Sequence, residues 1–329
     1  MLTLPRYEWL RPSTLERLLE HLGEHAAESL MVAGGTDAVP NLKHRLHEPR
    51  YVVHIGGIDS LRTIEDHTDG LSLGPLVTLS ELSTHAAVRR DFPMLARAAS
   101  LVASPQIRNM GTLGGNLCLD TRCTYYNQTY FWREALGFCL KKDGVVCHVV
   151  PQGKRCVAAH SSDVAPALIA LGASVEITGR GGVRTIAVDD FFVGDGVHNN
   201  VLAPGEVVTR VTLPSAARRM NCGYQKLRPR AAIDFPMLSV AFAARLAGGV
   251  CESARLVVSA IAAKPRSIGG VEALAKARPL DGALADALAQ AAYKQCRALI
   301  NVPYDQDYRQ EMVPVFVRRA VREAAGATP

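Results

Sequence analysis

The sequence predicts a mixed α/β (α+β) fold arranged in three consecutive blocks, and two patterns carry that prediction. An apolar run at Glu28–Ala33, a glycine turn, a short helical stretch and a second apolar run at Tyr51–Ile55 are typical of a small βαβ unit. Toward the C-terminus, β-rich runs on either side of Gly248 and Gly249 predict an antiparallel hairpin, and three helical stretches follow it.

The first block, residues 1–55, begins with a turn that leads into a helix. The strand Glu28–Ala33, the turn Gly34–Asp37, a helix at Ala38–Leu46 and the strand Tyr51–Ile55 then follow. We expect this block to form a small lobe of the kind that builds nucleotide sites.

The second block, residues 56–216, combines strands and helices around an irregular segment at about 119–158. Thr78 and Glu81 have the spacing of a capping box at the start of a helix. The irregular segment lacks periodicity and mixes aromatic residues with Lys, Gly and Cys, so we interpret it as an insertion held by something other than an apolar core. The other expected elements are strands at Leu71–Leu73, Ser174–Thr178 and Glu206–Leu213, helices at Phe92–Ala103 and Asp163–Leu171, and a loop at Ser104–Gly111.

The third block, residues 217–329, is predicted to be an antiparallel sheet covered by helices. Leu284, Leu288 and Ala292 form an apolar stripe on a helix near 283–299, and a helix near 306–324 has a similar stripe. The expected strands are Gly223–Arg228, Met237–Leu246 and Ala254–Ile261, and a further helix is expected near 268–278.

Composition and charge exclude several function classes. The net charge of +6 is spread out with no run of five or more Lys or Arg, which disfavours nucleic-acid binding. No apolar stretch reaches the ~18 residues of a membrane span. The N-terminus has no apolar signal region. We therefore expect a cytoplasmic protein without a membrane or nucleic-acid partner.

Two glycine turns, Ala33–Asp37 and Thr112–Asn116, have the chemistry of a phosphate site. Glycines allow positive φ and let a diphosphate approach the main chain, while free amides at a helix N-terminus donate hydrogen bonds to it. The first turn does not match the G-x-G-x-x-G fingerprint, and an ordinary tight turn is the alternative. Two such turns about 80 residues apart suggest a cofactor clamped between two lobes.

Four cysteines, Cys123, Cys139, Cys147 and Cys156, fall within 34 residues of the insertion. Clustering of this kind in a cytoplasmic protein favours metal ligands over disulfides. No C-x-x-C pair occurs, and Cys118 lacks the further partner of a plant-type 2Fe–2S motif. The spacing leaves a 4Fe–4S cluster and a structural zinc ion open, with unpaired loop cysteines as a third possibility. Three isolated cysteines are expected in the core: Cys222, Cys251 and Cys296.

Two histidines and a group of aromatic residues lie near these cysteines. We interpret His148 and His160 as polar loop residues, since four thiolates already complete a ligand shell. The aromatic residues are expected to pack within the insertion or to cover a metal centre; they are Tyr125, Tyr126, Tyr130, Phe131 and Trp132.

Taken together, the motifs resemble a known family. AGGTD at 33–37 and TLGGN at 112–116 are followed by Ser162 and Asp163, GYQKLR at 223–228 and DFP at 234–236. Over nearly the whole chain, apart from the insertion, this combination resembles the FAD-binding medium subunits of the xanthine oxidase family of molybdenum hydroxylases. The cysteine segment opening with RCTYY is similar to that of the 4-hydroxybenzoyl-CoA reductases, and related aldehyde oxidoreductases with a similar loop are the alternative.

The resemblance implies a two-lobed FAD-binding fold with two cofactors. Cys123, Cys139, Cys147 and Cys156 would bind a 4Fe–4S cluster, with Cys118 outside the ligand shell. The diphosphate of FAD would lie on the first turn, Asp163 near its ribityl chain and Lys226 near the flavin ring. The implied FAD contacts are Met31, Val32, Ala33, Gly34, Gly35, Thr36, Asp37, Ala38, Thr112, Gly114, Gly115, Asn116, Asp163 and Lys226.

The resemblance also implies a role in electron transfer, since the chain shows no substrate catalyst of its own. Electrons from ferredoxin would pass through the 4Fe–4S cluster and FAD to 2Fe–2S clusters on a small partner subunit. They would end at a molybdenum cofactor on a large partner, in a dimer of heterotrimers that reductively dehydroxylates 4-hydroxybenzoyl-CoA to benzoyl-CoA in anaerobic aromatic catabolism. Two alternatives stay open: a subunit of an aldehyde or xanthine-type dehydrogenase, and a flavin-free scaffolding subunit with a zinc-stapled cysteine loop.

Overall fold

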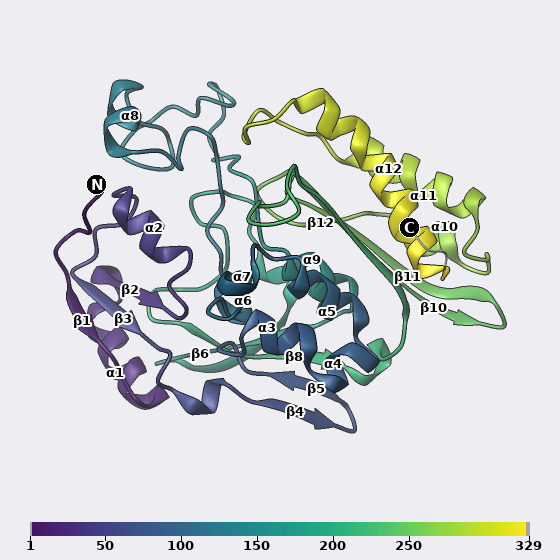
Figure 1. Cartoon of the computed structure of the whole chain (residues 1–329), viewed down its shortest axis with the longest axis horizontal. Coiled ribbons are helices and arrows are strands. Elements are labelled where there is room, and N and C mark those ends of the chain that lie inside the picture. The colour runs from purple at the N-terminus through teal and green to yellow at the C-terminus, as the bar shows by residue number, and fades with distance from the viewer. Residues whose placement is uncertain (1, 327–329) are drawn as a thin grey trace.

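The computed structural model describes residues 2–326, in which three sheets carry helices on their faces (Figure 1). The first sheet is parallel, with strand order β1-β3-β2, and α2 connects β2 to β3, which confirms the predicted βαβ unit. The three-residue strand β1 was not predicted, because it is too short to leave a periodic pattern. The elements are β1 (Glu8–Leu10), α1 (Leu15–His25), β2 (Ser29–Val32), α2 (Ala38–Lys43) and β3 (Tyr51–His54).

The second sheet has five antiparallel strands in the order β4-β5-β8-β6-β7. The two edge strands, β4 and β7, were missed from sequence. Their side chains are largely solvent-exposed, so neither strand shows the apolar alternation that marks a half-buried strand. The strands are β4 (Ile64–His67), β5 (Gly70–Leu73), β6 (Ser174–Gly179), β7 (Gly182–Ala187) and β8 (Val207–Pro214).

Short helices cover this second sheet. Thr78 and Glu81 form the predicted capping box, in which the Thr78 hydroxyl accepts from the Glu81 amide and the Glu81 carboxylate accepts from the Thr78 amide. The predicted loop at 104–111 is wrong in part, because the Ser104 hydroxyl caps the one-turn helix α6. The helices are α3 (Leu79–Thr84), α4 (Ala86–Asp91), α5 (Pro93–Ser100), α6 (Pro105–Arg108), α7 (Leu113–Leu117) and α9 (Val164–Ala170).

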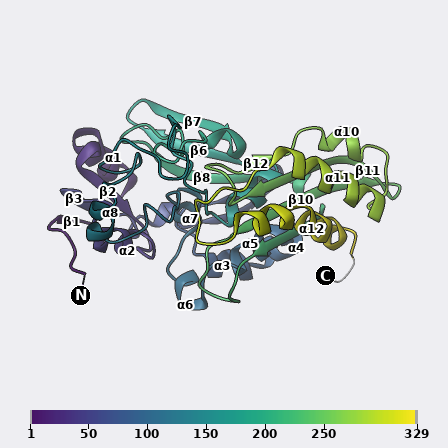
Figure 2. The same ribbon diagram turned by 90° about the horizontal axis from the view of Figure 1, so that it is seen from above.

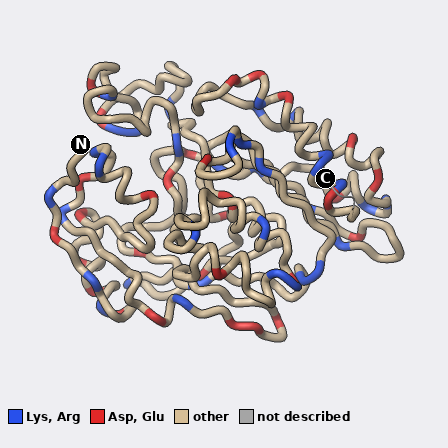
Figure 3. Tube along the Cα trace, viewed as in Figure 1, with Lys and Arg blue, Asp and Glu red and all other residues tan. Residues whose placement is uncertain are grey.

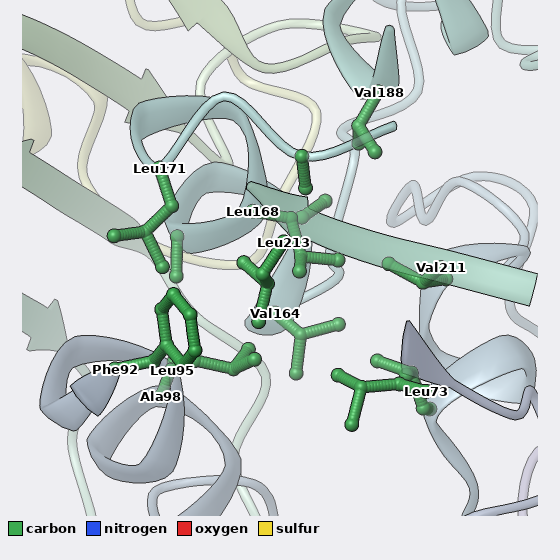
Figure 4. Packing of buried hydrophobic residues seen from close by; sticks show 14 of the residues in the cluster. Leu73, Phe92, Leu95, Ala98, Val164, Leu168, Leu171, Val188, Val211 and Leu213 are labelled. Atoms are coloured by element: carbon green, nitrogen blue, oxygen red, sulfur yellow. The ribbon is translucent and has the colours of Figure 1, made fainter. Parts of the chain in front are cut away.

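The largest core lies between these helices and the second sheet (Figure 4). Phe92 and Leu95 at the start of α5 pack toward Leu168 of α9 and Leu213 of β8. All four side chains are fully buried. Burying each one contributes about 1.5–3 kcal/mol, so this core fixes the positions of the loops that leave α5 and α9.

The third sheet is antiparallel, with strand order β12-β11-β10-β9, and three helices lie against it (Figure 2). The hairpin at Gly248 and Gly249 is confirmed, and both glycines have positive φ. The helix predicted near 268–278 is shorter, and the next one ends before Cys296, whose backbone is extended. The elements are β9 (Asn221–Leu227), β10 (Leu238–Ala247), β11 (Val250–Ser259), β12 (Arg266–Ser267), α10 (Val271–Ala275), α11 (Gly282–Gln295) and α12 (Gln306–Ala324).

The cysteine insertion projects beside α2 as an irregular excursion containing one short helix, α8 (Tyr130–Ala135) (Figure 1). The buried guanidinium of Arg133 donates to the carbonyls of His44 and Arg45, 3.3 and 3.0 Å away, and so fastens α8 to the end of α2. The boundaries at residues 55 and 216 between the three predicted blocks of the chain are not tested by these elements and remain predictions.

Charged side chains of both signs are interspersed along the chain (Figure 3). Within residues 2–326, none of the helices combines the length and apolar character needed to cross a membrane.

Candidate functional site

The two glycine turns line one cavity of about 380 Å³, here called the glycine-turn cavity. Most of the residues predicted to hold a cofactor reach its wall. Gly114 and Lys226 do not line it. The predicted residues on the wall are Met31, Val32, Ala33, Gly34, Gly35, Thr36, Asp37, Ala38, Thr112, Gly115, Asn116 and Asp163.

The first turn follows β2 and lies directly against the segment that precedes the second turn. A Cβ atom at Gly34 would lie 1.8 Å from the Met110 carbonyl oxygen, a distance that no side chain can occupy. Gly35 has a φ of 71°, which favours glycine. The glycines therefore let two main-chain segments, distant in sequence, close on one cavity.

The second turn is the start of α7. The Thr112 hydroxyl caps this helix by accepting a hydrogen bond from the Gly115 amide at 3.1 Å, and both residues line the cavity. Gly114 has a packing role, because a Cβ there would meet the Pro75 side chain at 2.5 Å. The Asn116 amide oxygen accepts from the Ser162 hydroxyl at 2.8 Å and so ties this turn to the start of α9.

Asp163, on the cavity wall, forms a buried ion pair with Lys226, which does not line the cavity. The Lys226 ammonium donates to an Asp163 carboxylate oxygen at 2.9 Å and to the Leu101 carbonyl at 3.1 Å. The Tyr224 hydroxyl donates to the Asp163 carbonyl at 3.0 Å. Burial raises the pKa of Asp163, and the Lys226 charge opposes that rise. Lys226 therefore influences the cavity only indirectly, by holding the charge and position of the Asp163 carboxylate.

Several cavity residues were missed from sequence. Ala103 and Ile233 have φ of 40° and 73°, and the Ile233 amide donates to the Ala103 carbonyl at 3.0 Å. Positive φ is rare for alanine and isoleucine, and no sequence pattern predicts it at these positions. Asp234 and Phe235 also line the cavity, although the sequence indicated them only as part of the DFP motif. Other cavity residues not predicted as contacts are Leu30, Asn41, His47, Leu79, Val102, Ile107, Gly111, Cys118, Leu119, Asp120 and Asn199.

Four cysteines of the insertion line a second cavity, here called the cysteine cavity: Cys123, Cys139, Cys147 and Cys156. Cys118 lies on the glycine-turn cavity instead. The insertion was interpreted as held by something other than an apolar core, but part of it is packed: Cys139, Cys147 and Cys156 are buried, and Cys139 packs with Leu46 and Tyr126.

Local contacts support two of these cysteines. The Asn127 side chain accepts from the Cys123 amide at 2.9 Å. A Cβ at Gly196 would lie 2.6 Å from the Cys156 sulfur, so that glycine leaves room for the thiol. Burial raises the pKa of the Cys123 thiol to about 12. Within residues 2–326, no three His, Cys, Asp or Glu side chains form a group that could hold a metal ion as they stand.

The neighbouring histidines and aromatic residues divide into two groups. His148 lines the cysteine cavity, with its Nε2 atom 2.5 Å from the Phe138 carbonyl oxygen. His160 lies outside the helices and strands, as interpreted, but its ring is fully buried against Phe192 and lies 3.1 Å from the Ser259 hydroxyl. Tyr125 and Tyr126 line the cavity. The expectation of packing fails for Phe131, which is 80% exposed, and Tyr130 and Trp132 are exposed as well.

One residue outside the insertion binds both of its ends. The Asn301 carbonyl accepts from the Thr124 amide at 2.9 Å, and the Asn301 side-chain amide donates to the Val157 carbonyl at 2.7 Å. Thr124 and Val157 directly follow the first and last of the four cysteines. Asn301 therefore holds the two ends of the cysteine segment at a fixed separation.

A second contact joins the insertion to the first glycine turn. The Arg122 guanidinium donates to the Asp37 carboxylate at 2.7 Å and lies 3.9 Å from the centre of the Phe235 ring. Asp37 and Phe235 both line the glycine-turn cavity. Arg122, which directly precedes Cys123, therefore brings the beginning of the insertion against the glycine-turn cavity.

Comparison with known proteins identifies the family. Residues 5–216 match the FAD binding domain in molybdopterin dehydrogenase, and residues 223–324 match the CO dehydrogenase flavoprotein C-terminal domain. The chain belongs to the FAD-binding medium subunits of the molybdenum hydroxylases. It is thus an oxidoreductase subunit with an FAD-binding, electron-transfer role, as the motifs had indicated.

Relatives of this medium subunit span its length. It is 34% identical over 251 residues to an aldehyde oxidoreductase FAD-binding subunit of Escherichia coli, covering 74% of this chain and 77% of the relative. The carbon monoxide dehydrogenase medium chain of Hydrogenophaga pseudoflava is 26% identical over 323 residues, 97% of each chain. A solved structure of carbon monoxide dehydrogenase from that organism aligns with a TM-score of 0.80 and 25% identity, over 98% of this chain and 99% of the other. The match confirms the mixed α/β fold.

Proposed function

We propose that this medium subunit holds FAD in the glycine-turn cavity and a 4Fe–4S cluster in the cysteine cavity, and that it relays electrons between them. The observation that carries the proposal is the adjacency of the two cavities: Lys141 of the cysteine cavity donates to Asp120 of the glycine-turn cavity at 2.6 Å. Bound FAD supplies the ability to store one or two electrons, which suits it to exchange with one-electron centres.

The residues present fit FAD. Gly34 lets the first turn close against the Met110 carbonyl, and Gly34, Gly35 and Gly115 all line the cavity without a side chain that would fill it. We assign the diphosphate to the segment Met31–Ala38 and to the second turn around Thr112–Asn116. Asp163 would bind the ribityl chain, and Lys226 would hold the Asp163 carboxylate in place from behind.

The cysteine cavity fits a cluster through the chemistry of its donor set. Four thiols line one sheltered cavity, and thiolate is the ligand that iron–sulfur clusters require. Deprotonation of thiols such as Cys123 would accompany metal binding, so loading should release protons.

The test uses a matched pair of cysteine variants in the anaerobically purified chain. Cys123→Ser should remove iron and acid-labile sulfide while FAD stays bound. Cys118→Ser, on the glycine-turn cavity, should keep the iron. Zinc in place of iron in the wild type would contradict the assignment of a 4Fe–4S cluster. Equal iron content in both variants would contradict the assignment of Cys123 as a cluster ligand.

The finer assignment is that of the 4-hydroxybenzoyl-CoA reductase β subunit. It rests on the resemblance of the segment beginning at Arg122. On this assignment the chain would receive electrons from ferredoxin at the cluster and would hold FAD as the relay toward 2Fe–2S clusters on a small subunit and a molybdenum cofactor on a large one, in a dimer of heterotrimers. Two electrons and two protons convert 4-hydroxybenzoyl-CoA to benzoyl-CoA and water.

A second candidate runs in the opposite direction. The 34% identity to an aldehyde oxidoreductase subunit favours an aldehyde-oxidising complex, in which aldehyde and water give a carboxylic acid, two electrons and two protons. Anaerobic flavin spectra of the assembled complex separate the two. Bleaching of oxidised flavin by an aromatic aldehyde supports oxidation, and re-oxidation of dithionite-reduced flavin by 4-hydroxybenzoyl-CoA supports the reductase.

A further inference from the structure

One ion pair crosses the wall between the two cavities. Lys141 lines the cysteine cavity, and Asp120 lines the glycine-turn cavity. The Lys141 ammonium donates to an Asp120 carboxylate oxygen at 2.6 Å. The cation of this pair therefore belongs to a residue of the cysteine cavity, and its counter-anion belongs to a residue of the proposed flavin site.

The position of the Lys141 charge is tightly determined. Its side chain is only 5% exposed. The ammonium also donates to the Thr121 hydroxyl at 2.6 Å, the Thr121 carbonyl at 3.1 Å and the Gly196 carbonyl at 2.7 Å. It lies 4.4 Å from the centre of the Tyr126 ring, which also lines the cysteine cavity. These neutral partners would keep the ammonium in place even without Asp120.

The Asp120 carboxylate is held equally firmly. One oxygen accepts from the Thr121 amide at 2.8 Å, and the other accepts from the Tyr126 hydroxyl at 3.1 Å. Such donors fix the orientation of the carboxylate within the wall. Tyr126 thus contacts both members of the pair.

We propose that the charges of Lys141 and Asp120 set the difference in reduction potential between the two redox sites. The proposal rests on the proposed function, because it requires a cluster in the cysteine cavity. An electron held there adds one negative charge without forming or breaking a bond. The buried Lys141 cation favours that charge, and the Asp120 anion disfavours negative charge at either site.

The first test replaces the lysine in the cofactor-loaded chain. Lys141→Met removes the charge and keeps an unbranched stem. Dithionite titration followed by the EPR signal of the reduced cluster should show a lower cluster potential than in the wild type. Lys142→Met is the matched control: Lys142 is 31% exposed, pairs with Asp143 and does not line the cavity, so its removal should leave the potential nearly unchanged.

The second test replaces the aspartate, which should shift the cluster potential in the opposite direction. Asp120→Asn should raise the cluster potential and also the potential of the flavin, because it removes a negative charge while Lys141 keeps its neutral partners. Opposite shifts in the two variants, with iron and flavin retained, would establish the electrostatic role.

Three outcomes would overturn the inference. They are equal shifts in Lys141→Met and Lys142→Met, shifts of the same sign in Lys141→Met and Asp120→Asn, and loss of iron from both pair variants, which would make the pair a structural support. An iron-free wild-type chain would instead contradict the proposed function itself, and so the two failures are distinguishable.

Discussion

Gly34 and Met110 are in main-chain contact across 76 positions of sequence, so close that a Cβ at Gly34 would lie 1.8 Å from the Met110 carbonyl oxygen. This contact brings the first glycine turn onto the segment that leads into the second. The cavity between the turns therefore depends on the absence of one methyl group.

Gly34→Ala should prevent that approach and abolish stoichiometric flavin binding. We expect a loss of stability of about 1–3 kcal/mol, as for overpacking of a tight contact. Gly181→Ala is the control, because nothing lies within 4 Å of a Cβ there. Flavin absorbance per chain and the urea midpoint are the measurements, and a Gly34→Ala chain with full flavin content would refute the closeness of the turns.

Lys226→Met should destabilise the fold by about 3–5 kcal/mol, because it leaves the Asp163 carboxylate buried without its cation. Asp163→Asn in the same chain should restore part of that loss. Urea unfolding of both single variants and the double variant measures the coupling. Strictly additive losses would show that the pair does not interact.

Asn301→Ala should loosen the cysteine segment by removing the hydrogen bond to the Val157 carbonyl. The expected cost is about 0.5–1.5 kcal/mol, that of one lost hydrogen bond at a half-buried carbonyl. Limited proteolysis between residues 124 and 157 and the rate of iron loss to a chelator should both increase. The exposed Asn109 provides the control, and equal behaviour of Asn109→Ala and Asn301→Ala would count against the anchoring role.

Stability should fall with acid because of His160. Burial lowers the pKa of His160 from 6.5 to about 3, so between these values the unfolded chain binds a proton that the folded chain does not. The contribution of His160 is therefore complete above pH 6.5 and decreases by about 1.4 kcal/mol per unit as the pH falls toward 3. Urea midpoints of the wild type and His160→Gln across this range test it, and parallel curves would contradict the assignment.

The elements predictable from sequence were those with a periodic or turn signal. The βαβ unit around Gly34, the capping box at Thr78 and the hairpin at Gly248 all carry such signals, and each is present. The edge strands β4 and β7 carry none, since exposed edges need no apolar alternation.

The site was predictable only where the type of residue itself indicates its chemical role. Cysteines and glycines mark their own roles, and so the two cavities could be anticipated from Cys123 and Gly34. Ile233, with its positive φ, and Asn301, which holds both ends of the insertion, are ordinary residues whose roles arise from tertiary contacts. No local pattern reports such contacts.

The most direct test of the whole account is the cofactor content of the chain purified without oxygen. We predict about one FAD, about four iron atoms and about four acid-labile sulfides per chain, with little zinc. Zinc without iron, or a chain free of flavin, would contradict the account.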